Sequence, residues 1–287
     1  MRPNNLKTKI FLDSGDPAET REAINLLGFL DGQTTNPTLI SENPEILSRI
    51  EKGEKFEKKE IVDYYKEIIK EISSIIPESS VSVEVYADDK TSKDEIISQA
   101  RDMFLWAPNI HIKLPITAKC LEVAGILVKE NFNLNMTLAF DQEQASAVYE
   151  ATKGAEKGQI FISPFVGRLD DKGENGMDLV RNILKMYQNS DHHVEVLIAS
   201  VRNLEHFLCA LKAGSDIITA PLKVLKEWVE KEKIIPNTGW VCERKKLEPI
   251  PYREIDLGKN WREYNIHDEL TDIGIKKFCD DWNKLIK

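Results

Sequence analysis

Short apolar runs alternate with longer amphipathic segments along most of the chain. The longer segments have apolar residues at helical spacing, as in Ile61–Ile72 and Leu179–Tyr187. Asp16 and Pro17 begin the first of them with a cap and a fixed first turn. The runs predicted to be strands are Lys9–Asp13, Gly32–Thr35, Val81–Val85, Ile110–Leu114, Leu134–Phe140, Ile160–Phe165, Val194–Val201 and Asp216–Ala220.

Strands that alternate with helices in this way predict parallel pairing through right-handed crossovers. Such a sheet either closes into a barrel or stays open and doubly wound. No Gly-x-Gly-x-x-Gly follows the first predicted strand, which weakens the dinucleotide-binding version of the open sheet. We therefore expect an α/β fold, a (β/α)8 TIM barrel, over residues 1–231.

Residues 232–287 extend past the eighth strand and helix. Prolines interrupt the first half of this extension, and Leu270–Ile286 has the pattern of a terminal helix. The segment Arg49–Glu60 is almost wholly charged, which is typical of a solvated loop or helix start. Because there is no internal repeat and no low-complexity linker, we expect one domain with a C-terminal helical extension. By analogy of fold, the extension should cross the barrel mouth or an interface.

Several predicted strands carry polar residues at positions that alternate with apolar ones. In Val81–Val85 the valines suit the helix-facing side, so Glu84 points into the barrel. In Leu134–Phe140 the alternate apolar residues, Leu138 among them, are expected to face outward. Barrel enzymes keep their active sites at the carboxyl ends of the strands, where this reasoning gathers an inward polar set. The set is Asp13, Asn36, Glu84, Lys113, Asn135, Thr137 and Ser163.

This set contains the groups that imine chemistry needs. A lysine enclosed by apolar walls is disfavoured as the ammonium, and a neutral amine attacks a ketone to form an iminium ion. The iminium accepts electrons, so a nearby carbon–carbon bond can break while a base removes a hydroxyl proton. Asp13 and Glu84 are the available acids and bases, with Thr137 to hold a water. The alternatives are a buried Glu84–Lys113 ion pair without chemistry, and hydroxyls that are satisfied in the core.

Arginine and serine residues follow the sixth and seventh predicted strands. Arg168 comes after the sixth strand, and Ser200 and Arg202 lie at the end of the seventh. Guanidinium groups and a hydroxyl at neighbouring strand ends favour a phosphate site. The alternatives are a salt bridge from Arg168 to Asp170 or Asp171, and a surface charge for Arg202.

Composition narrows the class of protein. The 287 residues are 41% hydrophobic and 30% charged, with a formal net charge of −9. An acidic balance of mixed charges argues against nucleic-acid and acidic-membrane partners, although a small basic pocket stays compatible with it. No apolar run approaches the roughly 20 residues of a membrane span, and the N-terminus lacks a signal-peptide pattern. We therefore expect a cytoplasmic protein.

Cysteine and histidine spacing gives no sign of a metal site or of a disulfide framework. The histidines follow no metal-binding pattern, and there is no Gly-x-Ser-x-Gly for a serine nucleophile. The cysteines are widely scattered, so we expect reduced thiols that mostly fill the core. They are Cys120, Cys209, Cys242 and Cys279.

Eight stretches between about Ile10 and Trp228 resemble the transaldolase and fructose-6-phosphate aldolase family. They are FLDSGDP, GQTTNPTLI, VSVEV, HIKLP, NMTLAF, ISPFVGRLDD, IASVRN and DIITAPLKVLKEW. The resemblance implies that Lys113 forms the imine, that Asp13 is the acid and base on the substrate hydroxyl, and that Glu84 acts through a water held with Thr137. It implies that the residues binding the substrate and its phosphate are Asn36, Asn135, Ser163, Phe165, Arg168, Ser200 and Arg202.

The reaction implied by the resemblance moves dihydroxyacetone between ketose and aldose phosphates in the pentose phosphate pathway. Sedoheptulose 7-phosphate and glyceraldehyde 3-phosphate then give erythrose 4-phosphate and fructose 6-phosphate, with no cofactor or metal. The partners expected are sugar phosphates and further copies of the chain in a homo-oligomer, with no nucleic acid and no membrane.

Two positions separate the branches of this family. Aldolases that release free dihydroxyacetone tend to carry Gln at the Glu84 position and Tyr at the Phe165 position, so this chain is similar to the transaldolases. A fructose-6-phosphate aldolase and a non-catalytic sugar-phosphate-binding barrel are the alternatives. Asp-Ser-Gly-Asp at Asp13–Asp16 and Gln33 depart from the commoner family pattern, which leaves the acceptor and the oligomeric state open.

Overall fold

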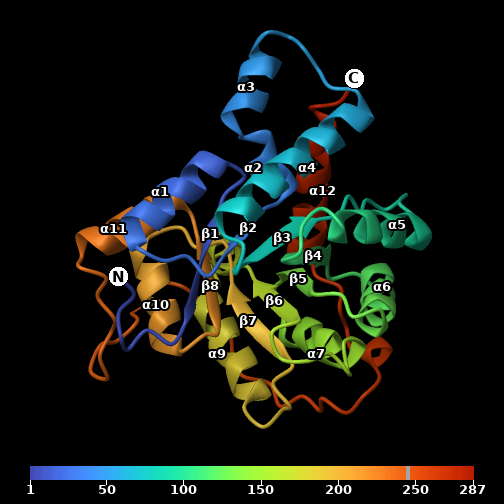
Figure 1. Ribbon diagram of the computed structural model, residues 1–287. Coiled ribbons are helices and arrows are strands. Elements are labelled where there is room, and N and C mark those ends of the chain that lie inside the picture. The colour runs from blue at the N-terminus through green and yellow to red at the C-terminus, as the bar shows by residue number, and fades with distance from the viewer. Residues whose placement is uncertain (244–245) are drawn as a thin grey trace.

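The computed structural model describes residues 1–243 and 246–287 and contains a closed barrel of parallel strands in the order β1 to β8 (Figure 1). The strands are β1 Lys9–Asp13, β2 Gly32–Thr34, β3 Ser80–Glu84, β4 Ile110–Pro115, β5 Leu134–Ala139, β6 Ile160–Pro164, β7 Val194–Ile198 and β8 Ile217–Ala220. The predicted TIM barrel is confirmed, and all eight predicted strands are present. The seventh ends at Ile198 rather than at Val201.

Helices surround the barrel and follow the strands in turn (Figure 1). They are α1 Pro17–Leu27, α2 Pro37–Ser41, α3 Pro44–Glu51, α4 Lys58–Ile75, α5 Lys93–Phe104, α6 Ala118–Lys129, α7 Gln142–Ala151, α8 Val166–Lys172, α9 Gly176–Tyr187, α10 Leu204–Ala213, α11 Leu222–Glu230, the short 3-10 turn η1 Trp261–Glu263 and α12 Glu269–Asn283. Asp16 caps α1 as predicted, because its side chain accepts from the Ala18 N–H at 2.8 Å. Among the described residues, no helix has the length and apolar character needed to cross a bilayer.

The strand register places the polar residues of the central strands side by side. Glu84 of β3 pairs with Lys113 of β4, and Lys113 pairs with Asn135 of β5. Thr137 of β5 pairs with Ser163 of β6. Neighbours in register on parallel strands point to the same face, so these side chains form one polar layer near the carboxyl ends.

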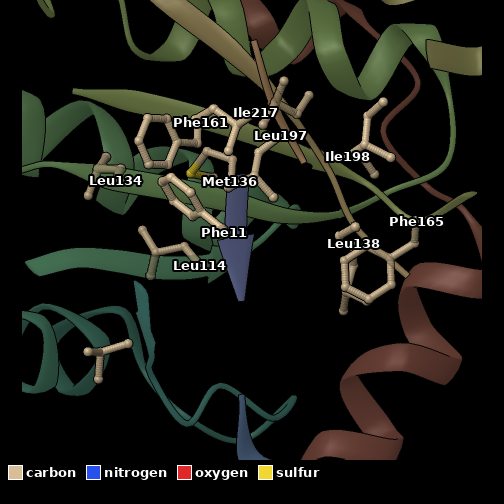
Figure 2. Packing of buried hydrophobic residues seen from close by; sticks show 14 of the residues in the cluster. Phe11, Leu114, Leu134, Met136, Leu138, Phe161, Phe165, Leu197, Ile198 and Ile217 are labelled. Atoms are coloured by element: carbon tan, nitrogen blue, oxygen red, sulfur yellow. The ribbon is translucent and has the colours of Figure 1, made fainter. Parts of the chain in front are cut away.

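Aromatic rings fill the barrel interior below this layer. The Phe11 and Phe161 rings pack edge to face with centroids 6.0 Å apart, and the His111 ring stacks on Phe161 at 4.1 Å. Figure 2 shows both phenylalanines in the core. A Cβ on Gly32 would lie 2.5 Å from Phe11 Cζ, so the ring packs against a position where only glycine fits. The barrel floor is therefore a packed core.

Strand β5 departs from regular alternation at its carboxyl end. Its pairing with β6 shifts between Thr137 and Ala139, and Leu138 has a φ of 62°. A Cβ built on Gly274 of α12 would lie 2.7 Å from Leu138 Cδ2, so the Leu138 side chain contacts the terminal helix. Figure 2 shows Leu138 apart from the cluster around Phe11 and Phe161. The expectation that Leu138 faces outward is therefore wrong, because the bulge re-aims the side chain.

The extension after α11 packs along the outside of the barrel and returns over its mouth (Figure 1). Gln142 of α7 holds its middle part by exchanging hydrogen bonds with the backbone of Arg253, at 3.1 and 2.9 Å. The terminal helix α12 then contacts β5 near its start and α2 near its end. It covers the barrel mouth, which is one of the two positions expected for it.

The expectation that all four cysteines are reduced is wrong for two of them. Cys209 of α10 and Cys242 of the extension form a disulfide with Cα atoms 5.3 Å apart. Cys120 and Cys279 are buried free thiols. The disulfide partners are 33 residues apart in sequence, and only the path of the extension over α10 brings them together.

Candidate active site

Lys113 and Glu84 form a dry ion pair in the polar layer of the barrel. Their side chains are 4% and 3% exposed, and Lys113 Nζ lies 3.0 Å from Glu84 Oε2. The contact lacks hydrogen-bond alignment, since Glu84 Oε2 has no hydrogen-bond partner among the described residues. Lys113 Nζ instead donates to the Thr35 carbonyl at 3.2 Å. The carboxylate is therefore close to the ammonium without being fully satisfied by it.

Both carboxyl groups near Lys113 hold protons more readily than ordinary carboxyls. Burial raises the pKa of Glu84, and the Lys113 charge opposes this only in part. Burial likewise raises the pKa of Asp13, against the opposing effects of Lys113 and of the Thr34 hydroxyl. That hydroxyl donates to Asp13 Oδ1 at 2.6 Å. Carboxyl groups whose pKa is raised in this way suit proton transfer.

A hydrogen-bonded chain of side chains lies beside the ion pair. Ser163 donates to Asn135 Oδ1 at 2.7 Å, and Asn135 Nδ2 donates to Ser82 Oγ at 3.0 Å. Thr137 Oγ1 is buried and has no partner among the described residues. A buried hydroxyl without a partner is uncommon and is often explained by a water or a ligand.

A cavity of about 250 Å³ opens above Lys113 at the carboxyl ends of the strands. Eight of the predicted site residues line it: Asp13, Asn36, Lys113, Ser163, Phe165, Arg168, Ser200 and Arg202. The other three are fully buried beside or behind Lys113 and do not line the cavity: Glu84, Asn135 and Thr137. Within the described residues, no three His, Cys, Asp or Glu side chains are placed to hold a metal ion.

Asn36 reaches the cavity from the start of α2, where it is also the helix cap. Its Oδ1 accepts from the Leu39 N–H at 3.0 Å, which fixes the carboxamide. The amide nitrogen, Nδ2, is therefore the atom of Asn36 that can donate to a substrate oxygen.

Arg168 supplies a partly buried cation to the cavity. Its Nη1 is buried without a hydrogen-bond partner among the described residues, and its Cζ lies 5.2 Å from the Phe165 ring centroid. Burial lowers its pKa, but an arginine stays charged at any physiological pH. The aspartates considered as alternative partners are engaged elsewhere, since Asp170 pairs with His206 at 2.7 Å and Asp171 with Arg202 at 2.9 Å.

Ser200 and Arg202 lie on the turn between β7 and α10, next to Arg168. Ser200 has a φ of 60°, a left-handed conformation that is uncommon for residues with a side chain and that is found often at functional sites. Arg202 is 52% exposed, so it is both a surface charge and a cavity residue. The two arginines and the serine thus give the cavity a basic side.

Eleven further residues, which were not predicted as site residues, also line the cavity. Six of them are polar or belong to the terminal helix: Thr34, Thr38, Glu42, Thr219, Lys277 and Phe278. Strand parity could have predicted that Thr34 and Thr219 point into the barrel. They lie on β2 and β8, the two strands that pair with β1, and their hydroxyls are 2.6 Å apart. Nothing in the sequence signals Lys277 and Phe278, because they come from the terminal helix beyond the motifs.

Comparison with known proteins places this chain in a family. The family model described as Transaldolase/Fructose-6-phosphate aldolase matches residues 10–287. The chain belongs to this family. The match runs through α12, well past Trp228, where the resemblance by motifs ends. The matched region therefore includes the terminal helix.

Curated relatives cover most of the chain. A probable transaldolase of Dehalococcoides mccartyi is 37% identical over 222 residues, which are 77% of this chain and 90% of the relative. One of Citrifermentans bemidjiense is 33% identical over 279 residues, 97% of this chain and 100% of the relative. One of Thermoplasma volcanium is 38% identical over 242 residues, 84% and 97% of the two chains.

Proposed function

We propose that this chain is a transaldolase, which transfers a dihydroxyacetone unit from a ketose phosphate to an aldose phosphate through an imine on Lys113. One observation carries the proposal. Lys113 is enclosed beside Glu84 at 3.0 Å, yet it reaches a cavity that also contains Asp13, Arg168 and Arg202. An amine nucleophile, two proton carriers and a basic side are the parts that this reaction needs.

The first step is formation of the imine. The Lys113 ammonium gives a proton to Glu84, whose raised pKa favours the transfer because it removes two opposite charges from a dry site. The neutral amine adds to the ketose carbonyl, and the resulting carbinolamine loses water to leave an iminium ion. Glu84 and Thr137 lie on the strands on either side of β4, and their unpartnered oxygens suit a water that carries these protons.

The second step breaks the carbon–carbon bond. Asp13 takes the proton of the hydroxyl on the departing carbon, the bond to that carbon breaks, and its electrons move into the iminium to form an enamine. The departing aldose phosphate leaves. An acceptor aldehyde then takes the electrons of the enamine, its oxygen receives the proton from Asp13, and hydrolysis of the imine frees the new ketose phosphate. The raised pKa of Asp13 suits a group that takes and returns one proton.

The basic side of the cavity suits the phosphate that donor and acceptor share. Arg168 offers an unpartnered Nη1, and Arg202 and Ser200 stand beside it on the next turn. Asn36 and Ser163 are the neutral donors placed for sugar hydroxyls. The proposal places the reaction among the sugar phosphates of the pentose phosphate pathway, and none of its steps draws on a cofactor.

Borohydride trapping tests the proposal directly. The protein is incubated with fructose 6-phosphate, reduced, digested and mapped by peptide mass. We expect a reduced dihydroxyacetone or ketose adduct on Lys113, because only an imine is captured in this way. The absence of an adduct, or an adduct on another lysine, would show that the proposed chemistry is wrong.

A second assay separates transfer from release. With fructose 6-phosphate and erythrose 4-phosphate a transaldolase gives sedoheptulose 7-phosphate, whereas a fructose-6-phosphate aldolase gives free dihydroxyacetone without an acceptor. Glu84 and Phe165 in the cavity region favour transfer, since both differ from the residues of the releasing aldolases. A non-catalytic sugar-phosphate-binding barrel would give neither product.

A further inference from the structure

The terminal helix α12 is fixed over the cavity by contacts at both of its ends. Near its start, the Thr271 hydroxyl donates to the carbonyl of Leu138, on the β5 bulge, at 3.0 Å. Near its end, the Thr38 hydroxyl of α2 donates to Asp281 at 2.6 Å. Because both of its ends are held, α12 has a fixed position over the cavity and completes the cavity within one chain.

Phe278 is the residue that α12 presents to the reacting lysine. It is 5% exposed and lines the cavity. Its ring centroid lies 5.7 Å from Lys113 Nζ and 5.4 Å from Arg168 Cζ. The Phe165 ring lies at similar distances from the same two groups, 6.0 and 5.2 Å. Two rings from distant parts of the chain thus lie close to both the imine lysine and the buried arginine.

Gly274 sets how deep this ring lies. It is one helical turn before Phe278, so the two residues share a face of α12. A Cβ at position 274 would lie 2.5 Å from Arg168 Nη1 and 2.7 Å from Leu138 Cδ2, which is too close for either. Without a side chain there, the helix rests directly on Arg168 and brings Phe278 against Lys113.

The enamine on Lys113 has two fates, and water decides between them. In transfer, its carbon attacks an acceptor aldehyde. In release, the same carbon takes a proton, a water adds to the iminium that results, and the carbinolamine collapses to free dihydroxyacetone and the lysine amine. Apolar walls around the enamine keep water away and favour transfer. Phe165 is one such wall, and the position of Phe278 makes it the second.

We propose that Phe278 is a specificity-determining residue, which favours transfer over release by closing the side of the imine that Phe165 leaves open. This inference rests on the proposed function, because it concerns the fate of the imine on Lys113. It assigns to the C-terminal helix a part in the choice of reaction, in addition to its part in folding.

The test measures a ratio in the full-length chain. Release is the rate of free dihydroxyacetone from fructose 6-phosphate alone, and transfer is the rate of sedoheptulose 7-phosphate with erythrose 4-phosphate added. We expect Phe278→Ala to raise the ratio of release to transfer by about tenfold, because it opens the cavity to water beside the enamine. Phe278→Tyr should raise the ratio as well, since it keeps the ring and adds a hydroxyl that can hold water.

Ile273 provides a matched control on the same helix. It is 51% exposed, and it does not line the cavity. Ile273→Ala should leave the ratio unchanged. If it raises the ratio as much as Phe278→Ala does, general loosening of α12 is the cause and the proposal is overturned.

The remaining outcomes also decide whether Phe278 sets the ratio of release to transfer. If Phe278→Ala and Phe278→Tyr fold and keep the wild-type ratio, Phe278 only packs, and the inference is wrong. If Phe278→Ala does not fold, Phe278→Tyr alone decides in the same way. Borohydride trapping of the wild-type chain tests the proposed function separately from the role of Phe278. No adduct on Lys113 means that the proposed function has failed, whereas an adduct with an unchanged ratio overturns only the role of Phe278.

Discussion

The barrel strands contain two lysine–glutamate pairs, one at each end, and they differ in the exposure of the lysine and in hydrogen bonding. At the floor, Lys9 of β1 is 43% exposed and donates to both carboxylate oxygens of Glu195, at 3.1 and 3.0 Å. At the mouth, Lys113 is 4% exposed and approaches one oxygen of Glu84 without hydrogen-bond alignment. The floor pair is open to solvent at Lys9 and hydrogen-bonded at both carboxylate oxygens, whereas the mouth pair is buried and leaves Glu84 Oε2 without a hydrogen bond.

Under the proposed function, this difference separates a structural ion pair from a reactive one. A lysine that reaches water keeps its proton at little cost and holds its partner by two hydrogen bonds. A dry, poorly aligned pair costs free energy, and passing the proton from nitrogen to oxygen relieves part of that cost. Proteins keep such unsatisfied arrangements mainly where function uses them. The comparison predicts that the same substitution will change activity in the mouth pair and mainly stability in the floor pair.

The largest effect is expected from removing the two lysines. Lys113→Met should lower the transfer rate by at least about a thousandfold and abolish borohydride trapping, because it deletes the nucleophile. Lys9→Met should leave transfer within about threefold, and it should lower the free energy of unfolding by roughly 1–3 kcal/mol, since Glu195 loses its partner. Steady-state kinetics and urea unfolding measure both. Equal losses of activity in the two variants would remove the distinction between the pairs.

The two glutamates give the next largest contrast. Glu84→Gln should slow transfer by about a hundredfold, because the amide keeps the shape but cannot carry a proton. It should also increase the share of free dihydroxyacetone among the products. Glu195→Gln, with the same change in shape and charge, should leave both rates near those of the wild type. Wild-type transfer kinetics in Glu84→Gln would contradict the role given to this carboxyl.

Acidification should lower the stability of the protein through His111, which lies in the barrel floor. Burial lowers the pKa of His111 to about 4, from an ordinary value of 6.5. The unfolded chain therefore binds a proton below pH 6.5 that the folded chain refuses, and stability falls as the pH falls from about 6.5 to about 4. The loss is at most about 3 kcal/mol.

The His111 contribution is isolated by comparing urea unfolding of the wild type and His111→Gln across this pH range. The mouth carboxyls, whose pKa values are raised, act with the opposite sign in both proteins and cancel in the difference. We expect the wild type to lose more stability on acidification than the variant does. Identical pH profiles of the free energy of unfolding would mean that protonation of His111 does not contribute to the loss of stability.

The smallest effect is expected in the pH profile of kcat/KM, whose acid limb depends on Asp13 at the barrel mouth. The Thr34 hydroxyl holds down the pKa of Asp13, which burial raises. Thr34→Val should therefore move the acid limb of kcat/KM upward by about one pH unit, the worth of one hydrogen bond to a charged group. Thr219→Val is the matched control, because Thr219 contacts Thr34 rather than Asp13. A limb that stays in place in Thr34→Val would mean that Asp13 does not set it.

Periodicity predicted the barrel and the inward position of its polar residues, because each side chain of a strand points either into the barrel or out of it. That choice placed Glu84, Lys113, Asn135 and Thr137 in one layer before any contact was known. It failed at Leu138, where the bulge inserts an extra step and the alternation no longer applies.

The sequence alone determined the barrel, the lysine on its fourth strand and the polar residues that share its layer, because these follow from local spacing and strand parity. The tertiary structure alone decided which of these residues face the cavity, that Cys209 and Cys242 meet, and that α12 places Phe278 over Lys113. These are contacts between segments far apart in the chain. Their formation depends on the path of the C-terminal extension around the barrel, and no periodic pattern encodes that path.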